Sequence, residues 1–238
     1  MPRLITTLGD LSLAELPGVI LPHEHIRQRG AMNCIISSGN TDVESLKAEL
    51  KKVPSMDGLE LASTVSTTEP YFLGDEKSAI RVAVLDFGIK KNILNCLVER
   101  GAYVKVHNAK TGFDELEQFK PHGYFISNGP GDPAPMDYAI KTVKQIIAAG
   151  KPLFGICLGH QLLALANDIP TFKMHHGHRG LNHPVKNMIS GRCEITTQNH
   201  GFGVDPASVR ANPNIEITHV NLNDQSIEGI RMKNKPAF

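Results

Sequence analysis

The stretch Gly155-Ile156-Cys157-Leu158-Gly159 decides the fold of this 238-residue chain. The apolar run at 152–156 predicts a strand and the run at 161–166 predicts a helix, with a single thiol where the two meet. This strand–turn–helix pattern is typical of a nucleophile elbow, in which flanking glycines let the backbone turn sharply and leave room around the sulfur. The first amides of the helix favour a thiolate, so we expect Cys157 to attack a carbonyl carbon.

Upstream of the elbow, short apolar runs alternate with amphipathic runs. The predicted elements are, in order, strand 81–86, helix 93–98, strand 103–107, helix 113–119, strand 124–127 and helix 140–147. Such alternation predicts an α/β fold with a mostly parallel sheet and helices on both faces. Ligands of these sheets bind at the carboxyl ends of the strands, where both the elbow and the turn at 128–133 are expected.

The two ends of the chain do not follow this pattern. After residue 171 we expect an antiparallel segment, whose predicted strands are 185–188, 193–197, 215–220 and 227–232. Before residue 80, the sequence predicts one polar helix at 43–51 and a Ser/Thr-rich linker at 63–68.

Composition excludes several classes of function. Hydrophobic residues make up 41% of the chain and charged residues 21%, with a formal net charge of +1 and no basic run. This balance gives no electrostatic basis for binding nucleic acid or a membrane surface, so we expect a small-molecule or protein partner. The four cysteines (Cys34, Cys96, Cys157 and Cys193) show no CxxC spacing, and no leader sequence is apparent. We therefore expect a cytoplasmic protein without a membrane span.

Three further motifs contain candidate site residues. The loop Asn128-Gly129-Pro130-Gly131-Asp132-Pro133 offers backbone amides for an oxyanion hole, although alone it is equally consistent with a plain tight turn. The amide of Leu158 is the other expected oxyanion donor. Gln161 lies one helical turn after the thiol, where it could bind an amino-acid substrate or simply face solvent. Asn199-His200-Gly201-Phe202 is expected where a strand ends in a turn.

Histidines raise the question of a metal site. Six are clustered between residues 175 and 219: His175, His176, His178, His183, His200 and His219. No carboxylate or cysteine completes a familiar ligand spacing there, so we interpret them as polar loop residues rather than metal ligands. His23 and His25 face one side of a predicted strand, but a lone His-x-His is weak evidence for a metal. The sequence therefore predicts no metal in this chain.

The motif Gly-Ile-Cys-Leu-Gly-His-Gln-Leu-Leu-Ala at 155–164, together with the loop at 127–133, resembles the class I (triad) glutamine amidotransferases. These enzymes have a flavodoxin-like fold, hydrolyse glutamine through a cysteine thioester and release ammonia. Within that class, motifs at 86–92, 177–184, 198–202 and 233–238 are similar to the small chain of carbamoyl-phosphate synthetase. The resemblance covers about residues 26–238, and several motifs occur in the same order.

The resemblance implies roles for particular residues. Cys157 would be the nucleophile, and the residues implied to contact L-glutamine are Gly129, Gly131, Leu158, Gln161, Asn199, Gly201 and Phe202. Ammonia would pass to a large synthetase subunit that uses ATP, bicarbonate and Mg to make carbamoyl phosphate for arginine and pyrimidine synthesis. No cofactor is expected in this chain, and it has no GxxxxGK[ST] phosphate loop.

The sequence departs from the family pattern at both ends. A His-Pro-Glu segment after Lys-Pro-Ala-Phe supplies the catalytic His and Glu in the family, and the chain ends at Phe238, so we expect crippled catalysis and marginal stability. Most of the family's amino-terminal domain is also expected to be absent. Residues 8–25 instead resemble the start of phosphotriesterase-like metal hydrolases.

These departures define the expected organisation of the chain. We expect a fused or unrelated segment at 1–25, a remnant of the amino-terminal domain with a linker at 26–79, and an amidotransferase domain at 80–238. Two alternatives remain open: a non-catalytic module that binds glutamine or docks to a synthetase, and another class I amidotransferase.

Overall fold

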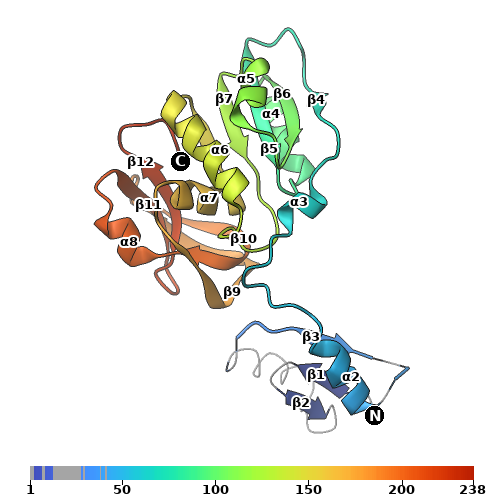
Figure 1. Cartoon of the computed structure of the whole chain (residues 1–238). Helices are drawn as coiled ribbons and strands as arrows, with labels where there is room; N and C mark the ends of the chain where they lie inside the picture. Colours follow the sequence, from blue (N-terminus) through green and yellow to red (C-terminus); the bar gives the residue numbers. More distant parts are fainter. Residues whose placement is uncertain (1–2, 7–8, 13–27, 29, 38, 41) are drawn as a thin grey trace.

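The computed structural model describes residues 3–6, 9–12, 28, 30–37, 39–40 and 42–238. A main body contains two sheets with their helices, and a smaller amino-terminal unit is joined to it by an extended stretch of chain (Figure 1). The Ala31 amide of this unit also donates to the His175 carbonyl of the body at 2.8 Å. Among the described residues, no helix is long and apolar enough to cross a membrane.

The larger sheet has the strand order β4-β6-β5-β7-β8. Its strands are β4 (Tyr71–Leu73), β5 (Ile80–Asp86), β6 (Ala102–Asn108), β7 (Gly123–Ile126) and β8 (Leu153–Gly155). All neighbouring pairs are parallel except β4 with β6. The predicted α/β fold with a mostly parallel sheet is therefore confirmed.

Helices cover both faces of this sheet, because residues that alternate along its strands point to opposite sides. The helices are α3 (Ala62–Val65), α4 (Lys91–Glu99), α5 (Phe113–Gln118), α6 (Asp137–Ala149) and α7 (Leu158–Ala166). Leu94 of α4 packs with Val84 and Val104 on one face. On the other face, α5, α6 and α7 pack over Ala83 and Leu85. Gly150 ends α6 in the left-handed conformation, as expected of a glycine that stops a helix.

The second sheet is antiparallel and has the order β10-β9-β11-β12. Its elements are β9 (Thr171–Asn187), β10 (Cys193–Val204), α8 (Pro206–Ala211), β11 (Ile215–Asn221) and β12 (Ile227–Met232). The predicted antiparallel segment is confirmed, but the interpretation of residues 175–183 as loop is wrong, since they lie within β9. Residues 199–202 likewise lie inside β10, at a β-bulge between His200 and Phe202, rather than in a terminal turn.

The amino-terminal unit is a three-stranded sheet with one helix. Its strands, β1 (Arg3–Thr6), β2 (Gly9–Ser12) and β3 (Cys34–Ile36), have the order β2-β1-β3. Helix α2 (Val43–Leu50) agrees with the predicted helix and buries Leu46 and Leu50. Because β1 pairs with β3, the expected segments 1–25 and 26–79 share one sheet.

The predicted linker at 63–68 is instead docked on the main body. Ala62 is fully buried, and the Thr67 amide donates to the Asp86 carboxylate at 2.8 Å. The Ala109 amide donates to Ser66 Oγ at 2.8 Å. A Ser/Thr-rich composition suggested flexibility, but here the hydroxyls and amides satisfy polar groups at the carboxyl edge of the larger sheet.

Candidate active site

Cys157 lies at the junction between β8 and α7 and is the N-cap residue of that helix. Its backbone angles, φ 55° and ψ −104°, fall in a region that non-glycine residues rarely adopt. Neither Gly155 nor Gly159 has a positive φ. The sharp turn is therefore made by the cysteine itself, and the expectation that the flanking glycines make it is wrong. Strain at a single residue is characteristic of a nucleophile elbow.

The two glycines are needed for close approach instead. A Cβ on Gly155 would lie 2.5 Å from the carbonyl carbon of Gly159, and a Cβ on Gly159 would lie 2.2 Å from the carbonyl oxygen of Ile126. Both distances are too short for any side chain, because the obstacles are backbone atoms. The start of α7 thus packs directly on β7 and β8, which fixes the position of the thiol at the carboxyl edge of the sheet.

The environment of the thiol differs from the sequence expectation. Burial raises the pKa of Cys157, and the negative charge of Glu228 raises it further. The Leu158 amide hydrogen-bonds to the sulfur and, with the positive charge of Lys90, acts in the opposite direction. Burial outweighs these two effects, so the helix N-terminus alone does not produce the expected thiolate in the free chain.

The loop at 128–133 lies against the elbow. A Cβ on Gly129 would come within 2.7 Å of Leu158 Cδ2, so this glycine touches the residue that follows the nucleophile. Asn128 fixes the loop by accepting a hydrogen bond from the Lys90 amide and donating one to the Gly88 carbonyl. The structure therefore places Gly129 against the side chain of Leu158, next to the elbow.

Gly131 has a different set of neighbours. Its φ of 95° requires glycine, and it bridges to Glu60 in an antiparallel pair. The next amide, that of Asp132, donates to the Leu59 carbonyl at 2.9 Å. This half of the loop holds the incoming chain at 59–61 on the body.

Gln161 is buried rather than exposed. Its side-chain Nε2 donates to the Phe202 carbonyl at 2.8 Å, which joins α7 to β10 across the two sheets. The interpretation of Gln161 as a solvated helix residue is therefore wrong. Phe202 is also buried, Gly201 is partly buried, and Asn199 is exposed on β10.

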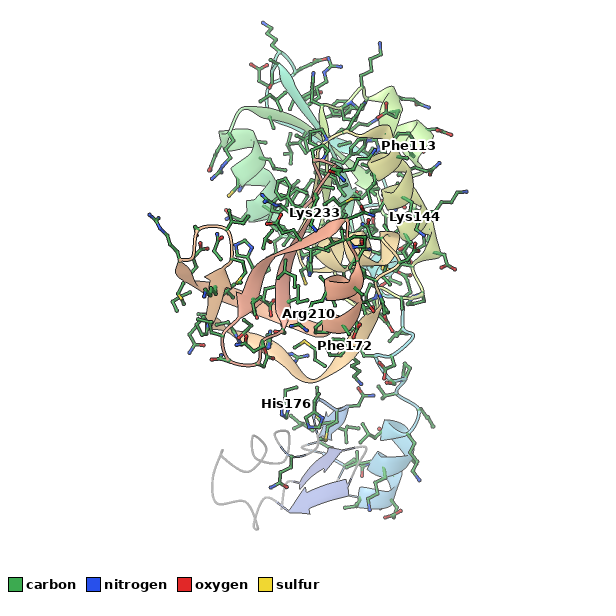
Figure 2. The ribbon with its side chains drawn as sticks, turned by 90° about the vertical axis from the view of Figure 1, so that its left-hand side faces the viewer. Phe113, Lys144, Phe172, His176, Arg210 and Lys233 are labelled. Atoms are coloured by element: carbon green, nitrogen blue, oxygen red, sulfur yellow. The ribbon has the colours of Figure 1, made fainter. Side chains whose placement is uncertain are left out.

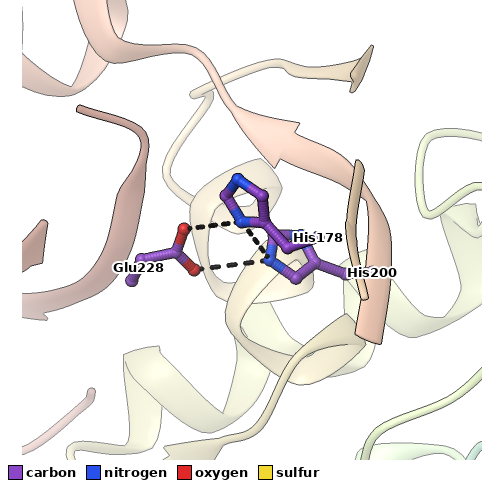
Figure 3. Close-up of side chains that lie close together, drawn as sticks. All are labelled: His178, His200 and Glu228. Atoms are coloured by element: carbon purple, nitrogen blue, oxygen red, sulfur yellow. Dashed lines mark hydrogen bonds and ion pairs between the residues drawn. The ribbon is translucent and has the colours of Figure 1, made fainter. Parts of the chain in front are cut away.

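A histidine–glutamate cluster that the sequence analysis missed lies close to the elbow. His178 of β9, His200 of β10 and Glu228 of β12 come together with their polar atoms facing one another (Figure 3). Hydrogen bonds to Glu228 raise the pKa of His178 to about 9 although burial opposes this. Burial alone would raise the pKa of Glu228, but hydrogen bonds with His178, His200 and Ser226 hold it well below its ordinary range.

A signal for this cluster was present in the sequence but required the strand pairing. His178 and His200 are directly opposite each other in the β9–β10 register. Glu228 lies between the apolar residues Ile227 and Ile230 of the predicted strand at 227–232. Only the fold brings the carboxylate to the two rings, because β12 pairs with neither β9 nor β10.

His160, one helical turn after the thiol, is a further imidazole at the site. Burial lowers its pKa to about 4, while the charge of Glu228 acts in the opposite direction. Its Nε2 is buried and has no hydrogen-bond partner among the described residues. The pair His23 and His25, which the sequence analysis weighed as metal ligands, lies outside the described residues.

A sequence profile described as "Glutamine amidotransferase class-I" matches residues 83–238, which include the elbow, the loop at 128–133 and the cluster. Among curated proteins, the chain is similar to carbamoyl phosphate synthase small chains. It is 47% identical to that of Chlorobaculum tepidum over 97% of this chain and 63% of the relative, so the match includes part of residues 1–25. It is 44% identical to that of Salmonella typhimurium over 98% of this chain and 63% of the relative.

The chain spans about three-fifths of the length of the curated relatives it matches. Solved structures with a similar fold include a putative GMP synthase protein from Thermoplasma acidophilum. It has a TM-score of 0.57 and 20% identity and covers 66% of this chain and 80% of its own. A glutamine amidotransferase from Thermotoga maritima has a TM-score of 0.51 and 14% identity, covering 66% of this chain and 73% of its own.

Proposed function

This chain belongs to the class-I glutamine amidotransferase family, and from that membership we propose that it hydrolyses L-glutamine through Cys157 as the small chain of a carbamoyl phosphate synthase. The observation that carries the proposal is the strained Cys157 at the β8–α7 junction, with Gly129 against Leu158 beside it. The ammonia would be used by a large synthetase chain that binds ATP, bicarbonate and Mg. Its product, carbamoyl phosphate, would serve arginine and pyrimidine synthesis in the cytoplasm.

The proposed reaction has two steps. Cys157 sulfur forms a bond to the side-chain carbonyl carbon of glutamine, the C–N bond breaks, and ammonia leaves with the proton from the thiol. Water then attacks the thioester, which releases glutamate and restores the thiol. The amides of Leu158 and of the loop at 128–133 would stabilise the oxyanion in each step.

The pKa of the thiol bears on how this reaction starts. Burial and the charge of Glu228 favour the neutral thiol in the free chain. A base must therefore remove the proton as glutamine binds, and the family pattern assigns that role to a His-Pro-Glu segment after residues 235–238. Those last residues already run parallel to β8: the Gly155 amide donates to the Phe238 carbonyl at 2.9 Å, and the Phe238 amide donates to the Leu153 carbonyl at 3.0 Å. A chain continuing in that direction would reach the edge where Cys157 lies.

A second candidate function is supported by the same raised pKa. With a neutral thiol, the chain would bind glutamine or dock to a large chain without hydrolysing the amide. The two functions differ in ammonia release: the enzyme releases ammonia and needs Cys157 to do so, whereas the binding module releases none.

Ammonia release from glutamine tests the proposal directly. We expect release by the chain extended through the family's His-Pro-Glu segment and mixed with a purified large chain of a carbamoyl phosphate synthase, and its loss in Cys157→Ser. Cys193→Ser is the matched control, because Cys193 is exposed and lies at the start of β10. Release that survives Cys157→Ser contradicts the proposal. A stable complex with the large chain and no release supports the binding module instead.

A further inference from the structure

The cluster of His178, His200 and Glu228 has the compact geometry of a ligand set. His178 Nδ1 lies 3.1 Å from His200 Nε2. The Glu228 carboxylate spans both rings, with Oε1 3.2 Å from His178 Nδ1 and Oε2 3.4 Å from His200 Nε2. The three side chains are only 8%, 14% and 11% exposed, respectively.

In each ring, the nitrogen that faces away from the cluster already has a hydrogen-bond partner. His178 Nε2 lies 2.8 Å from Asp224 Oδ2, and His200 Nδ1 lies 2.9 Å from the Phe202 carbonyl oxygen. A carboxylate and a carbonyl can only accept hydrogen bonds, so each of these ring nitrogens must carry the hydrogen. In the neutral rings, His178 Nδ1 and His200 Nε2 are then both unprotonated.

When both rings are neutral, all the inward-facing atoms are therefore acceptors. Two nitrogen lone pairs and two carboxylate oxygens point at one small volume, and in the neutral rings no hydrogen lies between them. Such a set repels itself unless positive charge occupies its centre, as protons or as a cation.

The spacing suits a metal ion. Tetrahedral zinc bonds nitrogen and oxygen at about 2.0–2.1 Å, which places neighbouring ligand atoms about 3.3 Å apart. The separation of the two ring nitrogens, 3.1 Å, is close to that value, and one ligand atom from each of the three side chains lies within 4.8 Å of the others. Two histidines and a glutamate are also a ligand set that zinc uses, with a position left for water. The Asp224 and Phe202 oxygens orient the rings as the outer partners of metal-bound histidines do.

We propose that His178, His200 and Glu228 bind a divalent transition-metal ion of the zinc class, and that Asp224 and the Phe202 carbonyl orient the two histidine rings. The ion joins β12 to the β9–β10 hairpin. In the described sheet, β12 is not paired directly with either strand of that hairpin. It also introduces positive charge beside Glu228, whose negative charge acts on Cys157. Metal binding at this cluster can be measured without substrate, so its test does not depend on the proposed glutamine chemistry.

Zinc titration of the metal-free full chain, followed by calorimetry and by metal content after dialysis, tests the site. We expect one zinc per chain and a rise in Tm with zinc. Glu228→Gln and His200→Gln are each expected to weaken binding at least about 100-fold, and Asp224→Asn about 10-fold to 100-fold through the orientation of His178. Each variant is first checked for native circular dichroism.

Two variants serve as matched controls. His176→Ala removes an exposed histidine of the same strand, on the part of β9 that faces the amino-terminal unit (Figure 2), and Glu216→Gln removes a glutamate paired with Arg231 on the same sheet. Both should bind zinc as the unaltered chain does. Failure of the unaltered chain to retain zinc overturns the proposal, as does binding that survives Glu228→Gln and His200→Gln.

Cobalt(II) provides a measurement that needs no variant. In the unaltered chain the bound ion should give the intense visible absorption of a four- or five-coordinate site with nitrogen and oxygen ligands. A weak spectrum like that of the hexaaqua ion would overturn the proposal even if the cluster variants did not fold.

Discussion

At the scale of single residues, the position of the thiol depends on two glycines, Gly155 and Gly159, because any side chain there would collide with backbone atoms. A Cβ atom on Gly159 would collide with the backbone of Ile126, and a Cβ atom on Gly155 would collide with the backbone of Gly159. The strained angles of Cys157 persist because the strand and helix on either side are packed this closely. The sequence pattern located the elbow correctly, but it assigned the sharp turn to the flanking glycines rather than to Cys157.

We expect Gly159→Ala to destabilise the chain by about 3 kcal/mol or more, because the new methyl group would meet a backbone oxygen that cannot move aside. Gly112→Ala is the control, since nothing lies within 4 Å of a Cβ there and its φ is not positive. Urea unfolding of both variants measures the difference in the free energy of unfolding. Equal midpoints for the two variants would show that α7 does not pack on β7 as described.

His107 gives a pH dependence at the residue scale. It is fully buried in β6, both ring nitrogens lack partners among the described residues, and burial, with the charge of Lys105, lowers its pKa to about 4. The unfolded chain takes up a proton near pH 6.5 and the folded chain only near pH 4. The contribution to stability is therefore complete above pH 6.5 and is lost as the pH falls toward 4.

We expect His107→Phe to reduce the loss of stability between pH 7 and pH 5 by on the order of 1–2 kcal/mol, because the buried neutral ring is replaced by one that cannot be protonated. Some pH dependence should remain, since the pKa of His160 is also lowered to about 4. Urea unfolding at both pH values measures the effect, with the exposed His176→Phe as control. A pH dependence unchanged by His107→Phe would contradict this account.

At the scale of elements, much of the arrangement could be predicted. Apolar runs located β5, β6, β7 and β8, and Ile93 and Leu94 with their neighbours located α4, because these buried elements have clear periodicity. The hairpin of β9 and β10 was underestimated, since the histidines between Met174 and Val185 do not resemble a strand. Of these, His178 is buried, and its burial comes from its cross-strand contact with His200 and from Glu228, which local sequence does not show.

The candidate site also contains residues that local sequence predicts and residues that only the fold brings together. Cys157, Leu158 and Gly129 were predicted by local motifs, and the structure brings them together. His178, Asp224 and Glu228 were not, because their proximity depends on a strand that pairs with neither histidine strand. Gln161 was left open between two roles, and only the packing of α7 on β10 shows that its amide is used within the protein.

At the scale of the whole molecule, the amino-terminal unit and the main body are joined by an exposed stretch. Every residue from 51 to 58 is exposed, and none lies in a helix or strand. The unit has a small core, in which Leu46 and Leu50 are the buried hydrophobic residues among those described. Such a stretch is where a protease is expected to cut first.

We expect limited trypsin digestion to cut after Lys51 or Lys52 and to leave a resistant fragment that contains both sheets of the main body. Mass spectrometry of the early products measures this, and Lys51→Gln with Lys52→Gln should delay the cut while leaving the far-UV spectrum unchanged. First cleavage at Arg192, in the exposed turn between β9 and β10, would contradict the description of the two units.

The central claim is that Cys157 is a nucleophile in a glutamine site, and covalent trapping tests it most directly. The chain, extended through the family's His-Pro-Glu segment, is treated with a glutamine-mimicking electrophile, with and without a purified large chain, and labelled residues are identified by mass spectrometry. The account predicts labelling of Cys157 that is faster than that of free cysteine and is slowed by glutamine, with exposed Cys34 and Cys193 labelled no faster than free cysteine. Labelling of Cys157 no faster than free cysteine, and unaffected by glutamine in both conditions, would contradict it.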